Sequence, residues 1–271
     1  MPKTIVITGA SDGIGAAAAR QLKLSGHHLV IVGRSAGKTQ AIAREIGADH
    51  HLADFARLDD VRRLAATLAA AYPSIDVLAN NAGGYFASRA ETADGFELTF
   101  QVNHLAPFLL TKLLMDTLTL SRAAVIQTAS AGARMGRLDP GDFEHAKDFN
   151  PRVAYATAKL DNILFTQELH RRFHAHGIST AAFHPGTVAT NFASDSGGYL
   201  KLMYGSRLVR SLMATADKAA RQLVWLAEST PGTDWESGRY YQNRKPRTIN
   251  PQMHDPDLAQ KLWEYSDESL G

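Results

Sequence analysis

Residues 4–15 read TIVITGASDGIG, a short apolar run that passes directly into a loop containing three glycines. The Ala-rich stretch that follows, residues 16–24, has the composition of a helix. Gly9 permits a tight turn, Gly13 lets the backbone approach a pyrophosphate, and Gly15 lets the helix pack closely. The first N–H groups of such a helix attract phosphate. This order of strand, loop and helix predicts a dinucleotide site; an ordinary glycine-rich turn is the alternative.

The rest of the chain repeats an alternation of short apolar runs and longer amphipathic stretches. Further strands are predicted at residues 29–32, 50–52, 75–80, 124–128, 180–184 and 238–241. Helix stops are indicated at Ser25-Gly26, Ile46-Gly47 and Tyr72-Pro73. The pattern predicts an α/β fold, a Rossmann-type, doubly wound parallel sheet of about seven strands with helices on both faces. No linker or repeat interrupts it, so residues 1–271 are expected to form one domain.

Composition excludes several classes of function. Hydrophobic residues make up 45% of the chain, the net charge is +2, and there is no cysteine. Disulfides, thiolate metal sites and a cysteine nucleophile are therefore excluded, and the balanced charge argues against nucleic acid. With no apolar run long enough for a signal peptide or a membrane span, a cytoplasmic protein without membrane contact is expected.

Histidines give the only hint of a metal site. His170, His174 and His176 lie close in sequence, but Arg171 and Arg172 between them would repel a cation and no carboxylate completes a ligand set. No metal site is predicted.

The cofactor is indicated by the residue after the second predicted strand. NAD enzymes carry an acidic residue near this point, which binds the ribose 2′-OH, whereas this chain has Arg34, with Lys38 one helical turn further on. A guanidinium suits a 2′-phosphate, so NADP(H) is predicted in preference to NAD(H); a solvated surface arginine is the alternative. Asp12 adds an acid to the glycine loop and is expected to cap the helix.

A tyrosine and a lysine four residues apart form the candidate proton-transfer pair. Tyr155 and Lys159 would share one helix face, and an adjacent cation favours the phenolate of a tyrosine. On spacing alone a surface pair is the usual outcome. Ser130 and the segment 80–83, Asn-Asn-Ala-Gly, follow neighbouring predicted strands at the edge where such sheets bind ligands. This context favours a catalytic constellation.

Together these motifs resemble the short-chain dehydrogenase/reductase family over essentially the whole chain, and more closely its retinol-dehydrogenase and WW-domain-oxidoreductase branch. The resemblance implies four catalytic positions, Asn103, Ser130, Tyr155 and Lys159. It implies cofactor contacts from Gly9, Ser11, Asp12, Gly13, Ile14, Gly15, Arg34, Asp54, Phe55, Asn81, Ala82, Gly83, Tyr155, Lys159, Pro185, Gly186 and Val188. The branch is indicated by residues 100–105 and 108–111, by the long insertion between Ser130 and Tyr155, by His184 and by residues 262–266.

The resemblance also implies roles. Tyr155 is expected to be the general acid in carbonyl reduction, Lys159 to hold the nicotinamide ribose and lower the pKa of Tyr155, and Ser130 to bond the substrate oxygen. Asn103 is expected to anchor a water that relays protons. Dimers or tetramers are expected through the helices after Gly95 and Val153, although insertions of this branch can block those faces.

Residues 187–215 interrupt the alternation with an apolar, glycine-punctuated stretch and are predicted to form a substrate lid. Its side chains indicate a lipophilic carbonyl or alcohol, retinoid-like, steroid-like or xenobiotic; covering the protein's own core or a partner subunit is the alternative. Tyr85 and Phe86 could line the same pocket or belong to the core. Competing functions are a non-catalytic dinucleotide sensor or scaffold, and a light-driven or epimerase-like relative.

Overall fold

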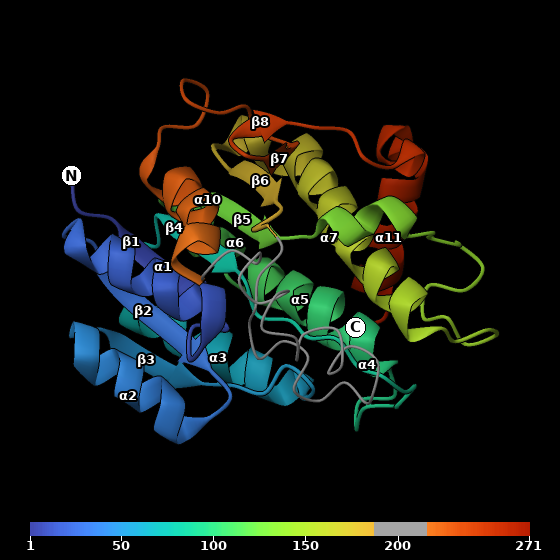
Figure 1. The fold of residues 1–271 in the computed structure, drawn as a ribbon, viewed down its shortest axis with the longest axis horizontal. Coiled ribbons are helices and arrows are strands. Elements are labelled where there is room, and N and C mark those ends of the chain that lie inside the picture. Colours follow the sequence, from blue (N-terminus) through green and yellow to red (C-terminus); the bar gives the residue numbers. More distant parts are fainter. Residues whose placement is uncertain (187–215) are drawn as a thin grey trace, which may run out of the picture.

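The computed structural model describes residues 1–186 and 216–271. All its strands form one sheet in the order β3-β2-β1-β4-β5-β6-β7-β8 (Figure 1). Their bounds are β1 Thr4–Thr8, β2 His28–Gly33, β3 Asp49–Leu52, β4 Val77–Asn80, β5 Ala124–Thr128, β6 Ser179–Phe183, β7 Arg239–Gln242 and β8 Lys245–Pro246. Strands β1 to β7 are parallel, and the order reverses between β1 and β4. Ligands of such sheets bind outside the strand ends at this point.

The predicted fold class is confirmed, but the sheet has eight strands rather than about seven. The extra strand, β8, is two residues long and pairs antiparallel with β7. Asn243 and Arg244 join the two strands with positive φ values of 51° and 60°, the backbone of a tight hairpin. Neither residue of β8 is buried, so the sequence contains no apolar run that would reveal it.

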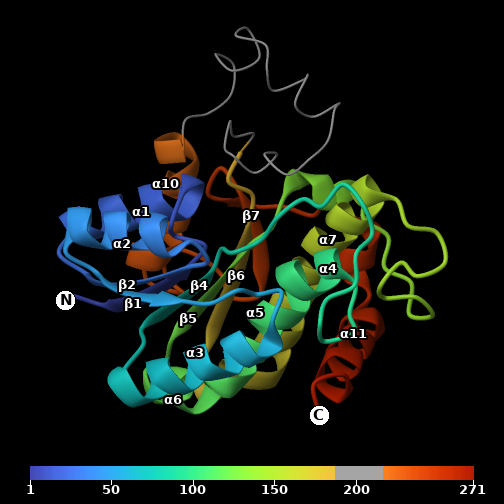
Figure 2. The same cartoon turned by 90° about the horizontal axis from the view of Figure 1, so that it is seen from below.

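Helices cover both faces of the sheet (Figure 2). One face carries α1 (Gly13–Leu24), α2 (Ala36–Ile46) and α10 (Ala216–Glu228); the other carries α3 (Leu58–Ala71), α4 (Leu98–Phe100), α5 (Ala106–Leu113), α6 (Met115–Leu120), α7 (Pro151–Phe173) and α11 (Pro256–Glu268). In β1, Ile5 and Ile7 belong to the core under α1, whereas Val6 belongs to the core under α7. Because side chains alternate along a strand, each apolar run supplies both cores at once.

Helix ends follow the predicted stops. Helix α1 ends at Leu24, α2 ends before Gly47 in the left-handed conformation, and α3 ends before Tyr72. Helix α7 begins after Asn150, whose side chain accepts hydrogen bonds from two first-turn N–H groups, with Pro151 at its first position. Most of α7 is buried because it packs between the sheet and α11. Its side chains are therefore held firmly.

No helix within residues 1–186 and 216–271 combines the length and the apolar character needed to cross a membrane.

Candidate active site

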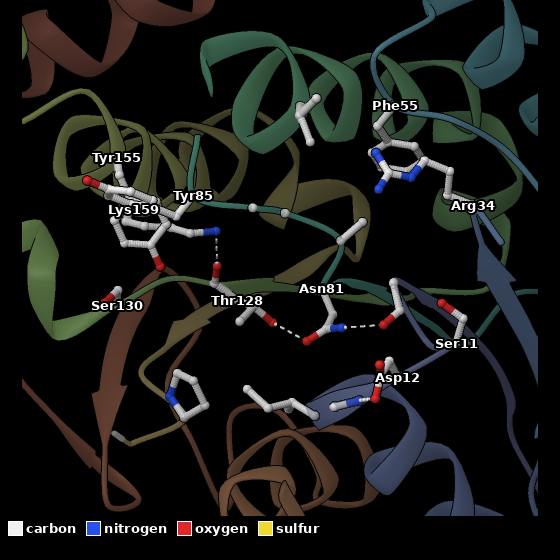
Figure 3. Close-up of a pocket in the computed structure, with 18 of the residues that line it drawn as sticks. Ser11, Asp12, Arg34, Phe55, Asn81, Tyr85, Thr128, Ser130, Tyr155 and Lys159 are labelled. Carbon is white, nitrogen blue, oxygen red and sulfur yellow. Dashed lines mark hydrogen bonds between the residues drawn. The ribbon is translucent and has the colours of Figure 1, made fainter. Parts of the chain in front are cut away.

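A cavity of about 780 Å³ opens at the carboxyl ends of β1, β4, β5 and β6. This volume lies in the range of small-molecule sites, roughly 300–1,000 Å³. Figure 3 shows the glycine loop and Arg34 on one side of it, and Ser130, Tyr155 and Lys159 on the other. The first side is called the nucleotide end below, and the second the proton-transfer end.

The glycine loop packs tightly against the segment after β4. Gly9 has a φ of 65°, and a Cβ there would lie 2.7 Å from the Cα of Ala82. A Cβ on Gly15 would lie 2.5 Å from the carbonyl oxygen of Gly9, so Gly15 serves packing and does not line the cavity. Thr8 was not among the predicted site residues, yet its Oγ1 accepts hydrogen bonds from the N–H groups of Asn81 and Ala82, both at 3.0 Å. These contacts join the two loops.

The predicted cap of α1 is confirmed. Asp12 Oδ1 accepts a hydrogen bond of 2.8 Å from the N–H of Gly13, and Oδ2 lies 3.1 Å from Lys38 Nζ. Arg34 lies exposed on the cavity rim, and among the described residues no hydrogen bond or ion pair engages it. Ser11 and Ile14 also line this end.

Asp54 and Phe55 follow β3 and line the same end of the cavity. Asp54 Oδ1 accepts a hydrogen bond of 3.0 Å from the N–H of Ala56, which fixes the turn, and Phe55 is buried. Their contact with an adenine stays a prediction.

At the proton-transfer end, the structure brings Ser130, Tyr155 and Lys159 together. A Cβ on Gly132 would lie 3.3 Å from Ser130 Oγ and 3.9 Å from Tyr155 Cε1, so these two side chains flank one point. Lys159 Nζ lies 5.7 Å from the centroid of the Tyr155 ring. A phenol, an ammonium and a hydroxyl therefore converge on one wall of the cavity.

Lys159 is buried, with only 3% of its surface exposed. Its Nζ donates a hydrogen bond of 3.2 Å to the carbonyl of Thr128, which also accepts a hydrogen bond of 3.4 Å from Asn162 Nδ2. Burial lowers the pKa of Lys159 to about 8, because an ammonium loses its hydration there. Thr128 and Asn162 were not predicted as site residues; the only signal for them is their position, at the end of β5 and one turn after Lys159.

Asn103 lies behind the cavity rather than in its lining. It belongs to a π-helical turn, Gln101–Leu105, a rare geometry that is frequent at functional sites. Its Oδ1 accepts a hydrogen bond from the N–H of Gly84, and its Nδ2 donates to the carbonyls of Gly84 and Thr99. A Cβ on Gly83 would lie 2.6 Å from Asn103 Oδ1 and 3.0 Å from Lys159 Nζ. Asn103 thus fixes the backbone of Gly84, the residue after Gly83, and its water-anchoring role stays a prediction.

The segment after β6 closes a third side. His184 Nδ1 accepts a hydrogen bond of 3.1 Å from the N–H of Ala131, so this nitrogen carries no proton, and burial lowers the pKa of the ring. Pro185 and Gly186 line the cavity beside it. Val188 and the predicted lid, residues 187–215, lie outside the described residues.

Aromatic and aliphatic side chains form another part of the cavity lining. Tyr85 and Phe86 both belong to the lining, and the Tyr85 ring centroid lies 5.8 Å from that of Tyr155. Leu98 and Val102 also line the cavity, and sequence reasoning did not single them out. Apolar walls of this kind are common in sites that bind small molecules.

The histidines considered for a metal have other partners. His170 Nδ1 bonds Ser237 Oγ at 2.8 Å, and His174 Nδ1 bonds the carbonyl of Ile178 at 2.9 Å. Over residues 1–186 and 216–271, no group of three metal-ligating side chains is arranged to hold an ion.

Comparison with known proteins identifies the family of this chain. The family model described as short chain dehydrogenase matches residues 3–198. The chain belongs to the short-chain dehydrogenase/reductase family. "Putative daunorubicin C-13 ketoreductase DnrU" of Streptomyces sp. (strain C5) is 38% identical over 276 residues, covering 99% of this chain and 93% of that protein. Human retinol dehydrogenase 13 is 32% identical over 286 residues, covering 99% and 85%.

A solved structure of an uncharacterized protein from Mycobacterium Paratuberculosis also matches this short-chain dehydrogenase/reductase, with 31% identity and a TM-score of 0.79. It covers 98% of this chain and 92% of that one. The resemblance to the retinol-dehydrogenase branch is confirmed. The chain is an oxidoreductase acting on CH–OH and C=O groups, in a family that binds NAD(P).

Proposed function

We propose that this chain is an NADP(H)-dependent reductase or dehydrogenase that interconverts a lipophilic carbonyl compound and its alcohol. The observation that carries the proposal is the convergence of Tyr155, Lys159 and Ser130 at one end of a cavity whose other end is the glycine loop. A dinucleotide fits this shape for two reasons. Gly9 packs closely against Ala82, so the glycine loop leaves room for the ligand, and the N-terminus of α1 faces the cavity, where its N–H groups can bind phosphate.

When bound, the nicotinamide supplies or accepts the hydride. In the reducing direction, Tyr155 donates its phenolic proton to the carbonyl oxygen while Ser130 donates a hydrogen bond to the same atom. The Lys159 ammonium favours the resulting phenolate electrostatically. In the oxidising direction, Tyr155 accepts the alcohol proton.

Lys159 has a second task in this proposal, the return of a proton to Tyr155. A lysine whose pKa is lowered to about 8 is a stronger acid than an ordinary lysine and gives up its proton more readily near neutral pH. Its hydrogen bond to Thr128 fixes the nitrogen while this occurs. Asn103 fixes the backbone of Gly84, and the preceding Gly83 lies close to Lys159 Nζ.

The preference for NADP(H) is supported by Arg34 and Lys38, two cations on the rim of the nucleotide end. A lipophilic substrate is supported by Tyr85, which lies against Tyr155, and by Phe86 and Leu98 in the cavity lining. Among the relatives, one carries the name of a ketoreductase and others carry the name of retinol dehydrogenases. A cytoplasmic location, supported by the absence of cysteine, is part of the proposal.

Possible homodimers or homotetramers stay a prediction. Helix α11 already lies against α7, so association through that helix face requires the outer side of α11 or its displacement. Size-exclusion chromatography with light scattering measures the state directly.

The test is a panel of aldehydes, ketones and alcohols assayed with NADP(H) and NAD(H), with the Tyr155→Phe variant as the blank. We expect turnover of at least one aromatic or polycyclic ketone with NADPH, and turnover about 10²–10⁴-fold lower by the variant. If the chain binds NADPH but turns over no compound of the panel, the sensor or scaffold function is favoured instead.

A further inference from the structure

Two cations and one carboxylate meet at the rim of the nucleotide end. Arg34 follows β2, Lys38 lies on α2, and Asp12 precedes α1; all three line the cavity. We propose that Asp12 is a specificity-determining residue that weakens selection for a 2′-phosphate, because its carboxylate neutralises Lys38 and leaves Arg34 as the effective cation. The inference rests on the proposed function, since it concerns the dinucleotide bound in the same cavity.

The carboxylate of Asp12 is held at both oxygens. Oδ1 accepts the hydrogen bond from Gly13 N–H at 2.8 Å, and Oδ2 pairs with Lys38 Nζ at 3.1 Å. The first contact is a helix cap and is strengthened by the positive end of α1. The second joins two side chains that are 49% and 58% exposed, and exposed ion pairs are weak. The carboxylate therefore stays at the cap, and its negative charge offsets that of Lys38 whether or not the ion pair is closed.

The charge of Asp12 should change the affinity for NADP(H) more than the affinity for NAD(H). Arg34, Lys38 and Asp12 together carry one net positive charge, and without the carboxylate they would carry two. A phosphate monoester carries a charge of about −1.5 to −2 near pH 7, whereas the ribose hydroxyl of NAD(H) is neutral. The pyrophosphate is common to both dinucleotides, so any effect of Asp12 on it cancels in the ratio of their affinities. That ratio reports the 2′-position alone.

The decisive variant is Asp12→Asn, because asparagine still caps a helix but carries no charge. Dissociation constants of NADPH and NADH are measured on the full chain by fluorescence titration at two salt concentrations. We expect the affinity ratio to shift toward NADPH by about two- to tenfold at low salt, and less at high salt. The matched control is Glu45→Gln, which breaks the Arg20–Glu45 ion pair between the same two helices, away from the cavity lining. Its ratio should equal that of the wild type.

A second variant makes the test independent of how well Asp12→Asn folds. Lys38→Gln leaves the carboxylate uncompensated and should shift the ratio toward NADH, while the double variant should return to within about twofold of the wild type. Ratios unchanged in both single variants would overturn the inference. If the wild-type chain binds neither dinucleotide, the proposed function itself fails, and the inference with it.

Discussion

The two ends of the cavity differ in what holds their functional groups. At the nucleotide end the lining is loop backbone with exposed side chains, among them Arg34, Lys38 and Asp12. At the proton-transfer end, Lys159 is almost fully buried and is held by the carbonyl of Thr128, on a helix packed on nearly all sides. Water screens charges at the first end and is excluded at the second. We therefore expect graded, salt-dependent changes in binding at the nucleotide end, and large changes in chemistry at the proton-transfer end.

The largest expected effect is that of Tyr155→Phe. Removing the hydroxyl removes the proposed proton donor but leaves the ring against Tyr85 and Lys159, so kcat should fall by about 10²–10⁴-fold. The dissociation constant of NADPH should stay within about twofold of the wild type, since the nucleotide end is untouched. Pre-steady-state kinetics and fluorescence titration give the two values, and a kcat close to that of the wild type would remove Tyr155 from the mechanism.

Gly83→Ala tests whether the proton-transfer end depends on close packing. The new Cβ would lie 2.6 Å from Asn103 Oδ1 and 3.0 Å from Lys159 Nζ, so at least one of these groups must move. We expect kcat to fall about ten- to a hundredfold, because small misplacements of positioned groups are costly. Gly37→Ala is the matched control: it lies on α2 with nothing within 4 Å of its Cβ, and should leave kcat unchanged. Equal activities of the two variants would contradict the expectation.

Arg34→Leu tests the nucleotide end. Loss of the exposed guanidinium should raise the KM for NADPH about tenfold, leaving the KM for NADH nearly unchanged. Steady-state assays with both cofactors give the KM values of the variant and of the wild type. The difference between the two proteins in the KM for NADPH should become smaller as salt is added, as should the wild type's preference for NADPH. A parallel rise in both KM values would show that Arg34 does not distinguish the cofactors.

Asp161→Asn tests whether ionisation of a buried carboxyl group on α7, the helix that carries Tyr155 and Lys159, costs stability. Asp161 is buried on α7, one of its oxygens has no hydrogen-bond partner, and burial raises its pKa well above the ordinary 3.8. The folded state keeps this proton at pH values where the unfolded state releases it, so the wild type loses stability as pH rises above about 4.

The asparagine variant lacks this ionisation and should lose less stability between pH 5 and pH 7, by up to about 1.4 kcal/mol per pH unit. Near pH 4, the free energy of unfolding should change with pH by nearly the same amount in the variant and in the wild type. Urea unfolding at several pH values measures both curves, and parallel curves throughout would exclude an ionisation cost at Asp161.

Much of the fold and site was predictable, because the deciding signals are local. Apolar runs placed the seven parallel strands within one or two residues, and the spacing of Tyr155 and Lys159 placed both on one helix. The cap at Asp12 was likewise predictable from its position before the helix. Signals weaker than these were missed, such as the two-residue strand β8 and the Oγ1 of Thr8, which bonds a segment more than seventy residues away.

The sequence by itself determined which residues stand at strand ends and which share a helix face, since these depend only on the period of the backbone. The tertiary structure decided that Asn103 bonds the backbone of Gly84, that Lys38 pairs with Asp12, and that burial lowers the pKa of Lys159 to about 8. Each of these depends on separate elements of the chain that meet only when the sheet and its helices pack. Burial and charge pairing are properties of that packing, and no local pattern contains them.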